Sequence, residues 1–332
     1  MTQTALTKDI LKLDPEKEIE KITRKMRLIL SKTLKRRGLV VALSGGIDSS
    51  VSAGLAVKAL GPERVFGLLM PERHSSDDTL ELSTSVADAF KIDRAHENIS
   101  QILEAVGFYR RYDDAVRQVV PEYGEGWKSK IVISSALESK GFNLFSVVVQ
   151  TPSGEIEKRR LPLKAYLEIV AATNFKQRTR KMLEYYHADR LNYAVTGTPN
   201  RLEYDQGFFV KLGDGAADIK PIAHLYKTQV YQLAAYLGVP ENVRKRPPTT
   251  DTYSLAQGQD EFYFSLPYDK MDLCLYAKNH GYQADAVAPL VGLTPEQAQR
   301  VYDDIDVKRS TTRYLHMPAV LIEKVSQIEA HN

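Results

Sequence analysis

The chain has 332 residues, of which 43% are hydrophobic and 26% charged, as in a soluble globular protein with a sizeable core. Its 45 basic and 42 acidic residues leave a net charge of +3, which argues against a dedicated nucleic-acid surface but not against an anionic small substrate. One cysteine excludes an internal disulfide and a cysteine-based zinc site, and no apolar run is long enough to span a membrane.

The N-terminal stretch mixes Asp, Glu and Lys and has no apolar core, so we expect neither a secretory signal nor a transit peptide. The expected location is therefore the cytoplasm, with no membrane partner. Apolar residues at helical spacing then predict an amphipathic helix over 19–34.

The most informative segment is Ser44-Gly45-Gly46-Ile47-Asp48-Ser49-Ser50. The apolar run 39–43 before it predicts a buried strand, and the paired glycines predict a tight turn. The following Asp and Ser residues are typical of a helix start, here opening a helix over 51–60. Such a turn aims backbone N–H groups and a helix dipole at one point, which suits a phosphate group. No lysine follows the glycines, so this is not the phosphate loop of the common NTPases.

The next elements continue an alternation of strands and helices. We predict a strand over 65–70, a helix over 76–90 capped by Ser75 or Ser76 with two aspartates in its first turn, and a strand over 94–99. This order predicts an α/β fold with a doubly wound, mostly parallel sheet and helices on both faces. Ligands of such sheets bind beyond the carboxyl ends of the strands, where the 44–49 loop is expected.

The pattern changes between 108 and 163, where runs at 142–150 and 155–161 flank a turn and predict a β-hairpin. We interpret 1–332 as one domain and 108–163 as an insertion within it. The alternation resumes with a helix over 165–187, a strand over 193–195, and a helix over 226–237 that Gly238 and Pro240 end.

Further polar motifs follow on the second half of the chain. The run Asn174-Phe175-Lys176-Gln177-Arg178-Thr179-Arg180 places Lys176 and Arg180 on one helix face, although ordinary surface charges would also account for it. Thr196-Gly197-Thr198-Pro199-Asn200 follows a strand and is therefore a second loop at the same sheet edge. Residues 207–218 are too rich in glycine for a helix. Cys274 lies in a helix-like run, where a packed thiol is expected.

The 44–50 loop resembles the Ser-Gly-Gly-x-Asp-Ser loop (PP-loop) of the ATP pyrophosphatases, which cleave ATP between its α and β phosphates. The motifs after it, namely Asn-x-Lys-x-Arg-x-Arg, Gly-Thr-x-Asn with a following Glu, Gly-Phe-Phe-x-Lys-x-Gly-Asp-Gly, Lys-Thr-Gln-Val and Gln-Asp-Glu, resemble those of the NAD synthetases. The resemblance runs from about residue 19 to 320, apart from 108–163. It implies an adenine nucleotide alpha hydrolase-like fold and the amidation of deamido-NAD to NAD.

The resemblance also implies site residues. For ATP it implies Ser44, Gly45, Gly46, Ser49, His74, Thr198, Lys227 and Thr249. For Mg²⁺ it implies Asp48 and Glu203, since two carboxylates suit a hard cation that keeps most of its waters. For deamido-NAD it implies Arg178, Phe208 or Phe209, Lys211 and Asp214. As catalytic residues we expect Asp48, Lys227 and Asp214.

The implied reaction begins when the substrate carboxylate attacks the α phosphate and forms an acyl adenylate. Magnesium, Lys227 and the loop amides are then expected to neutralise the charge of the leaving pyrophosphate, while Asp214 binds ammonium or accepts its proton.

The chain has no room for a glutaminase domain, so free ammonia or a separate glutaminase partner is expected as the nitrogen source. The family also implies a homodimer.

Three features depart from the family pattern and leave other functions open. Leu212 and Ala216 replace the usual Tyr and Gly, and alanine adopts positive φ less readily than glycine. The loop 244–252 also differs, and residues 108–163 enter where the acceptor substrate and dimer contacts lie. The alternatives are a PP-loop amide ligase for another carboxylate and a catalytically silent nucleotide-binding homologue, which the presence of all the implied ATP and metal residues disfavours.

Overall fold

The computed structural model describes residues 5–76, 78–133, 145–247, 252–255, 257–258, 263–264 and 266–325. Its centre is a parallel sheet with the strand order β3-β2-β1-β7. Strand β1 (Leu39–Ala42) pairs with β2 (Val65–Leu69) on one side and with β7 (Ala194–Thr196) on the other. Strand β3 (Asp93–His96) pairs with the outer side of β2. The predicted parallel sheet is confirmed.

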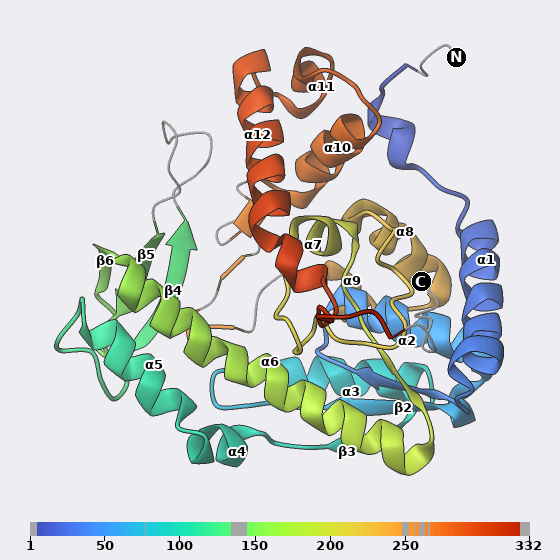
Figure 1. Cartoon of the computed structure of the whole chain (residues 1–332), viewed down its shortest axis with the longest axis horizontal. Coiled ribbons are helices and arrows are strands. Elements are labelled where there is room, and N and C mark those ends of the chain that lie inside the picture. Colours follow the sequence, from blue (N-terminus) through green and yellow to red (C-terminus); the bar gives the residue numbers. More distant parts are fainter. Residues whose placement is uncertain are drawn as a thin grey trace.

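Helices cover both faces of this sheet (Figure 1). The helices whose buried side chains share one core cluster are α1 (Pro15–Leu28), α2 (Ile47–Leu60), α3 (Thr79–Ala89) and α8 (Lys227–Leu237). On the other face lie α4 (Ser100–Ala105), α5 (Phe108–Arg117) and α6 (Leu163–Leu191). The doubly wound arrangement is therefore the one that the alternation of elements predicts.

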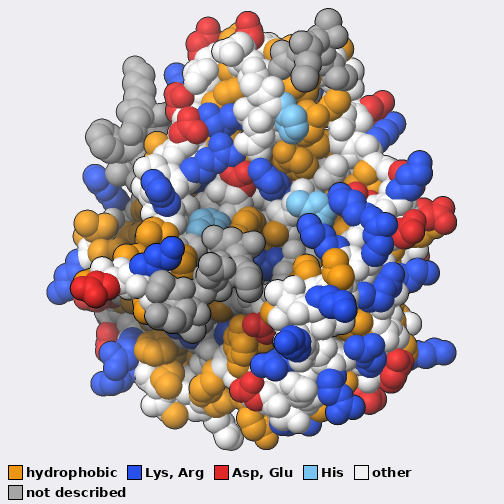
Figure 2. Space-filling view, turned by 45° about the vertical axis from the view of Figure 1, so that its right-hand side comes forward, with side chains coloured by type: hydrophobic (Ala, Val, Ile, Leu, Met, Phe, Trp, Pro, Cys, Tyr) orange, Lys and Arg blue, Asp and Glu red, His pale blue; other side chains and the backbone are white. Residues whose placement is uncertain are grey.

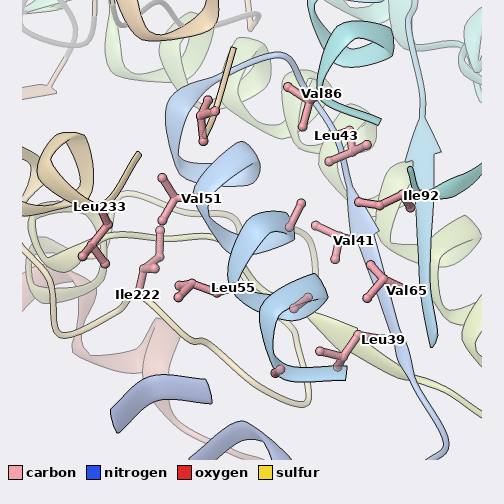
Figure 3. Packing of buried hydrophobic residues seen from close by; sticks show 14 of the residues in the cluster. Leu39, Val41, Leu43, Val51, Leu55, Val65, Val86, Ile92, Ile222 and Leu233 are labelled. Carbon is pink, nitrogen blue, oxygen red and sulfur yellow. The ribbon is translucent and has the colours of Figure 1, made fainter. Parts of the chain in front are cut away.

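The two-residue period of β1 explains why both faces are covered. Leu39 and Val41 point to the α2 side, where they pack near Leu55 (Figure 3). Val40 belongs to the core on the α6 side. All these strand side chains are fully buried. A strand that is apolar on both faces requires helices on both, because either exposed face would place a row of apolar side chains in water.

A second, antiparallel sheet lies beside α6 and has the order β4-β5-β6. Its strands are β4 (Lys128–Ile133), β5 (Phe145–Gln150) and β6 (Ile156–Arg160). The β5–β6 pair confirms the predicted hairpin, although its expected first residues, 142–144, lie outside the described residues. Strand β4, which pairs with β5, was not predicted.

The C-terminal helices form a third core cluster with α7 (Arg201–Gln206). They are α10 (Tyr268–Asn279), α11 (Ala284–Val291) and α12 (Pro295–Thr312), and the short α9 (Glu241–Lys245) follows α8. Cys274 is buried in this cluster, and burial raises the pKa of its thiol to about 12. The prediction of a packed thiol is confirmed.

Several predicted element ends were wrong. Helix α3 begins at Thr79 instead of residue 76, and the carboxylate of its N-cap residue, Asp78, makes no cap bond but pairs with Arg246. The expected third strand begins at Asp93 and ends at His96. Helix α6 is longer than predicted at both ends, and it stops where Asn192 adopts a left-handed conformation.

The surface carries mixed charges. On the face drawn in Figure 2, Lys and Arg side chains lie among Asp, Glu and apolar side chains. Among the described residues, no helix is both long and apolar enough to cross a membrane.

Candidate functional site

A cavity of about 770 Å³ opens at the carboxyl ends of β1 and β7. The chain leaves β1 towards β2 on one side, whereas β7 lies on the other, so the two loops diverge at this point of the sheet. Such a switch point in strand order forms a crevice where parallel sheets bind ligands. The cavity is lined by both predicted loops, 44–49 and 196–199, together with parts of α6, α8 and the segment after α12.

The loop after β1 is held by its own serines. The Ser44 hydroxyl lies 3.2 Å from that of Ser49 and accepts a hydrogen bond from the Gly46 N–H at 3.3 Å. Gly45 has φ +71°, and a Cβ there would lie 2.7 Å from the Cβ of Leu82. The first N–H groups of α2 have no carbonyl one turn before them, so they remain available to an anion.

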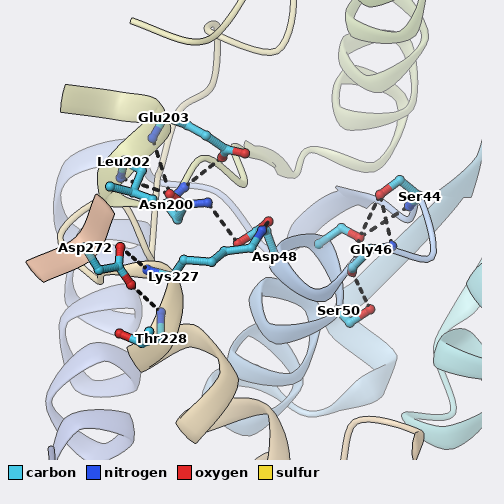
Figure 4. A network of polar contacts seen from close by, with 11 residues as sticks. Ser44, Gly46, Asp48, Ser50, Asn200, Leu202, Glu203, Lys227, Thr228 and Asp272 are labelled. Carbon is cyan, nitrogen blue, oxygen red and sulfur yellow. Dashed lines mark hydrogen bonds and ion pairs between the residues drawn. The ribbon is translucent and has the colours of Figure 1, made fainter. Parts of the chain in front are cut away.

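Asp48 lies in the first turn of α2, but it does not cap the helix. The N-cap is Gly46, which has no side chain to cap with. The Asp48 carboxylate instead pairs with the Lys227 ammonium and accepts a hydrogen bond of 3.2 Å from the Asn200 side chain (Figure 4). An aspartate at a helix start usually caps that helix, but Asp48 instead binds Asn200 and Lys227, which are distant in the sequence.

Asn200 connects the two expected metal-binding carboxylates. Its side-chain oxygen accepts hydrogen bonds from the backbone N–H groups of Leu202 and Glu203. Its backbone N–H donates to the Glu203 carboxylate at 3.1 Å. These bonds form a capping box at the start of α7. Because the Asn200 amide also reaches Asp48, one buried residue orients both carboxylates.

Lys227 is the first residue of α8, and its side chain is 2% exposed. The Asp272 carboxylate on α10 accepts from the Lys227 N–H at 3.2 Å and from the Thr228 N–H at 2.7 Å. Burial raises the pKa of Asp272 to about 7. Sequence reasoning missed Asp272, although an aspartate inside the apolar run 271–277 was a signal.

The charges at this point are strongly coupled. Burial, and then the nearby Asp48 carboxylate, raise the pKa of Glu203 to about 8. Burial alone would lower the pKa of Lys227, but Asp48 and Glu203 outweigh it and raise this pKa above its ordinary value. Two carboxylates facing one ammonium leave a net negative charge when all three are ionised, an arrangement that suits an added divalent cation.

Arg178, Lys211 and Tyr314 contact one another in the lining of the cavity. The Arg178 guanidinium donates to the Lys211 carbonyl at 3.3 Å. The Lys211 ammonium donates to the Tyr314 carbonyl at 2.8 Å and lies 5.1 Å from the centre of the Tyr314 ring. All three residues line the cavity. Sequence reasoning missed Tyr314, which lies after the last long helix.

The two candidate phenylalanines have different surroundings. Phe208 stacks on Tyr263 with a centroid distance of 4.7 Å and packs against the C-terminal helix cluster. Phe209 lies 4.9 Å from the His316 ring, and the Lys220 ammonium lies 5.7 Å from its centre. Both line the cavity, but of the two only Phe208 is packed against a core cluster.

Asp214 also lines the cavity, in the loop after α7. Its carboxylate accepts from the Val210 N–H at 2.8 Å, and burial raises its pKa. In this loop the positive φ falls on Leu212, at 60°, and Ala216 does not adopt one.

The remaining predicted residues are placed as follows. Thr198 lines the cavity with the β7 loop. His74 is not among the described residues that line the cavity. Its ring nitrogen Nδ1 lies 3.4 Å from the Lys176 ammonium. Thr249 lies outside the described residues. Arg246, which sequence reasoning missed despite the basic run 244–246, lines the cavity and binds Ser76 at 2.7 Å.

Residues 18–122 and 131–313 match the model of a family described as NAD synthase. A protein of Rhizobium meliloti (strain 1021), named NH(3)-dependent NAD(+) synthetase, is 58% identical over 321 residues, which are 97% of this chain and 96% of its own. A protein of the same name from Thermotoga maritima is 37% identical over 240 residues, 72% of this chain and 79% of its own.

Two solved structures show the same fold. The NH3-dependent NAD synthetase of Campylobacter jejuni, in complex with nitrate, has a TM-score of 0.60 at 24% identity and covers 93% of this chain and 100% of its own. The NMN synthetase of Francisella tularensis has a TM-score of 0.65 at 22% identity and covers 93% of this chain and 99% of its own.

Proposed function

The chain belongs to the NAD synthase family, and from that premise we propose that its cavity is where deamido-NAD is amidated to NAD with ATP and ammonia. The enzyme is a ligase that forms a carbon–nitrogen bond. The observation that carries the assignment of the site is the Asp48–Lys227 pair beside Glu203, where the first turns of two helices meet. ATP use follows from the family.

We place the ATP phosphates at the loop 44–49. The turn at Gly45 brings the backbone close to α3, and the Ser44 and Ser49 hydroxyls brace it from within. The N-terminus of α2 opens onto this point, and a helix N-terminus favours negative charge, whereas the first N–H groups of α8 are taken by Asp272. Lys227 and Thr198 then complete the phosphate side, with Thr249 as a further ATP residue. His74 does not line the described cavity, so it would act on ATP only through its contact with Lys176.

A magnesium ion fits the donor set formed by Asp48 and Glu203. The two carboxylates share Asn200 as a hydrogen-bond partner, and the pKa of Glu203 is raised because burial and Asp48 disfavour a second negative charge. A cation would relieve this cost, and carboxylates with phosphate oxygens and waters are typical magnesium ligands. When bound, the ion supplies charge neutralisation for the departing pyrophosphate.

The residues of the chain contribute mainly by position and charge. The substrate carboxylate must approach an anionic triphosphate, so donors fixed in advance lower the barrier more than a strong base would. The Lys227 ammonium is buried, held in place by Asp48, and protonated at neutral pH. It lies where charge develops when the bond between the α and β phosphates breaks and an acyl adenylate forms.

Ammonia then attacks the adenylate and AMP leaves. We assign Asp214 to this step, because its carboxylate lines the cavity and burial raises its pKa, which makes it a better proton acceptor. Cys274 is buried in a helix cluster, which does not suit a glutaminase nucleophile. Free ammonia is therefore the proposed donor, and a separate glutaminase is the alternative source.

The dinucleotide is assigned to the side of the cavity that Arg178, Phe209, Lys211 and Asp214 line. Phe209 supplies a ring that is not committed to a core cluster, and Arg178 and Lys211 supply positive charge for the diphosphate. A second acceptor is worth testing, because a structural neighbour with the same fold is an NMN synthetase. That likeness concerns the fold alone.

The chain is also proposed to form a homodimer and to fold as one domain with 108–163 inserted. The outer face of α6 exposes Leu163, Leu167, Met182 and Tyr186, which favours a covering partner. The 108–163 segment shares its core with β1 and β2 through Val40 and Leu68, which favours a single domain.

An assay of AMP, pyrophosphate and NAD with ATP, ammonium and deamido-NAD tests the function. Equal amounts of AMP and NAD are expected, with glutamine a poor substitute for ammonium. Nicotinic acid mononucleotide serves as the competing acceptor. ADP as the product, or AMP formed only with another carboxylate, contradicts the proposal, and absence of AMP with every acceptor would indicate a silent homologue.

A further inference from the structure

Lys176 on α6 carries an ammonium group that joins three segments of the chain. Its side chain is 1% exposed, and its Nζ donates to the Glu72 carboxylate at 2.7 Å and to the Thr252 carbonyl at 2.8 Å. The same Nζ lies 3.4 Å from the His74 Nδ1. Glu72 and His74 belong to the loop after β2, and Thr252 belongs to a segment that lies 76 residues beyond Lys176 in the sequence.

These contacts direct the charge of Lys176 into the protein. An ammonium has three N–H donors, and the carboxylate, the carbonyl and the imidazole nitrogen account for them. The Lys176 side chain lines the cavity, but its charged end is held by protein groups. Lys176 therefore differs from Arg178, two residues further along, whose exposed side chain remains on the cavity side.

The partners of Lys176 are themselves fixed. The Tyr109 hydroxyl donates to the second oxygen of Glu72 at 3.0 Å, and the Ser75 hydroxyl accepts from the Glu72 N–H at 3.1 Å. Burial, and then the charge of Lys176, lower the pKa of His74 to about 4, so its ring is neutral and can accept a hydrogen bond. The network thus requires Lys176 to be charged and His74 to be neutral.

The loop that Lys176 holds adjoins the phosphate loop. Strand β2 pairs with β1, so the loops that leave their carboxyl ends are neighbours. The β2 loop leads into α3, whose Leu82 and Ser83 pack against Gly45. Met70, Pro71, Thr252 and Tyr253 line the cavity beside Lys176. Lys176 is thus joined to the same wall of the cavity as the bend at Gly45.

We propose that Lys176 is a positioning residue for ATP, whose ammonium ties the β2 loop and residues 252–255 to α6 and so fixes the wall beside the phosphate loop. This inference rests on the proposed function, because it assigns that wall to the ATP side. It predicts that Lys176 acts on ATP binding and not on the dinucleotide.

The test compares Lys176→Met and Lys176→Arg with the unaltered enzyme. Lys176→Met is expected to raise the KM for ATP about tenfold, with less than about a threefold change in kcat and in the KM for deamido-NAD. Lys176→Arg retains a charged donor for Glu72 and is expected to recover part of the ATP affinity. An unchanged KM for ATP in soluble, folded Lys176→Met would overturn the inference, as would an equal rise for both substrates.

Two further measurements keep the test decisive. If Lys176→Met fails to fold because Glu72 is left unpaired, the double variant E72Q/K176M removes both charges and is expected to fold with the same ATP defect. NMR of the imidazoles should show the titration of His74 moving to higher pH in Lys176→Met, since Glu72 remains beside it. A purely structural lysine would leave the KM for ATP unchanged even in the double variant, which would overturn the inference.

Lys278→Met is the matched control. Lys278 pairs with Asp306 between two helices at 2.8 Å, and it does not line the described cavity. Its loss should leave the KM for ATP unchanged. If the unaltered enzyme makes no AMP, the proposed function fails, and ATP binding measured by calorimetry still tests Lys176. If the enzyme is active but Lys176→Met binds ATP as tightly as the unaltered enzyme, the proposed function stands and only the role of Lys176 is refuted.

Discussion

Asp48 and Lys227, which are 179 residues apart in the sequence, form an ion pair between the first turns of α2 and α8. Their side chains are 16% and 2% exposed, so solvent screens the pair only weakly. Both helices direct their positive ends at this point, and Glu203 lies close enough for the two carboxylates to disfavour each other's charge. The pair is therefore formed before any substrate binds, at the part of the cavity that we propose for the phosphates.

Replacing Asp48 by Asn should abolish most activity without unfolding the enzyme. The amide retains the size of the side chain but removes the charge that pairs with Lys227 and that the proposed magnesium site requires. We expect AMP formation to fall by about 100-fold or more. Steady-state release of AMP measures this, and a urea titration reports stability. An Asp48→Asn enzyme within threefold of the unaltered rate, at roughly equal stability, would contradict the assignment.

Gly45→Ala should weaken ATP binding through the backbone. The alanine must adopt φ near +71°, at a cost of about 1 kcal/mol, and its Cβ meets Leu82 at 2.7 Å. Gly281→Ala is the matched control, because Gly281 has φ +75° with nothing within 4 Å of a Cβ. Both variants should lose stability in thermal melts, but only Gly45→Ala should raise the KM for ATP. Equal ATP kinetics in the two variants would refute the role of the bend.

Two variants of Asn200 test separately its role as the cap of α7 and the charge balance around Asp48 and Glu203. Asn200→Ala removes the cap of α7 and should cost about 1 to 2 kcal/mol of unfolding free energy. Asn200→Asp retains the capping oxygen but sets a third carboxylate beside Asp48 and Glu203. We expect it to be strongly impaired in AMP formation, because the buried third carboxylate replaces the donor to Asp48 with a like charge. A fully active Asn200→Asp would show that the charge balance is not important.

The buried Asp272 should make stability depend on pH. Burial raises its pKa from 3.8 to about 7, so the folded protein retains a proton that the unfolded chain releases at lower pH. The stabilising contribution is complete below the unfolded pKa and is lost as pH rises through the folded one. Between about pH 5 and 8, the unaltered enzyme should lose roughly 2 to 3 kcal/mol more unfolding free energy than Asp272→Asn. Unfolding free energies from urea titrations at several pH values measure this difference. Curves of free energy against pH that run parallel for the two proteins would contradict the prediction.

The two phenylalanines should differ in what their loss affects. Phe208 packs against the C-terminal helices, so Phe208→Leu should lower stability by roughly 1 kcal/mol with a modest kinetic effect. Phe209 contacts His316 at the cavity, so Phe209→Leu should raise the KM for deamido-NAD and leave that for ATP unchanged. Kinetics with each substrate varied in turn, together with thermal melts, measure both effects. If Phe208→Leu instead raised the KM for deamido-NAD and Phe209→Leu lowered stability, Phe208 would be the phenylalanine that contacts the dinucleotide.

The local pattern of the sequence was enough for much of the fold. The apolar run before Ser44 and its glycine bend predicted β1, the turn and α2, because these signals depend on residues close together in the chain. Element ends were less well predicted where a side chain has a distant partner. Asp78 binds Arg246 instead of capping α3, which no nearby residue indicates.

The sequence by itself determined the parallel sheet, the loop that suits phosphate, and the order of motifs that places the chain in its family. Only the tertiary structure decided that Asp48 faces Lys227, that Asp272 caps α8, and that the charge of Lys176 points into the protein. The reason is physical. Periodicity and turn chemistry act over a few residues, whereas the partner of a buried charge is whichever group the packing of distant segments brings within a few ångströms.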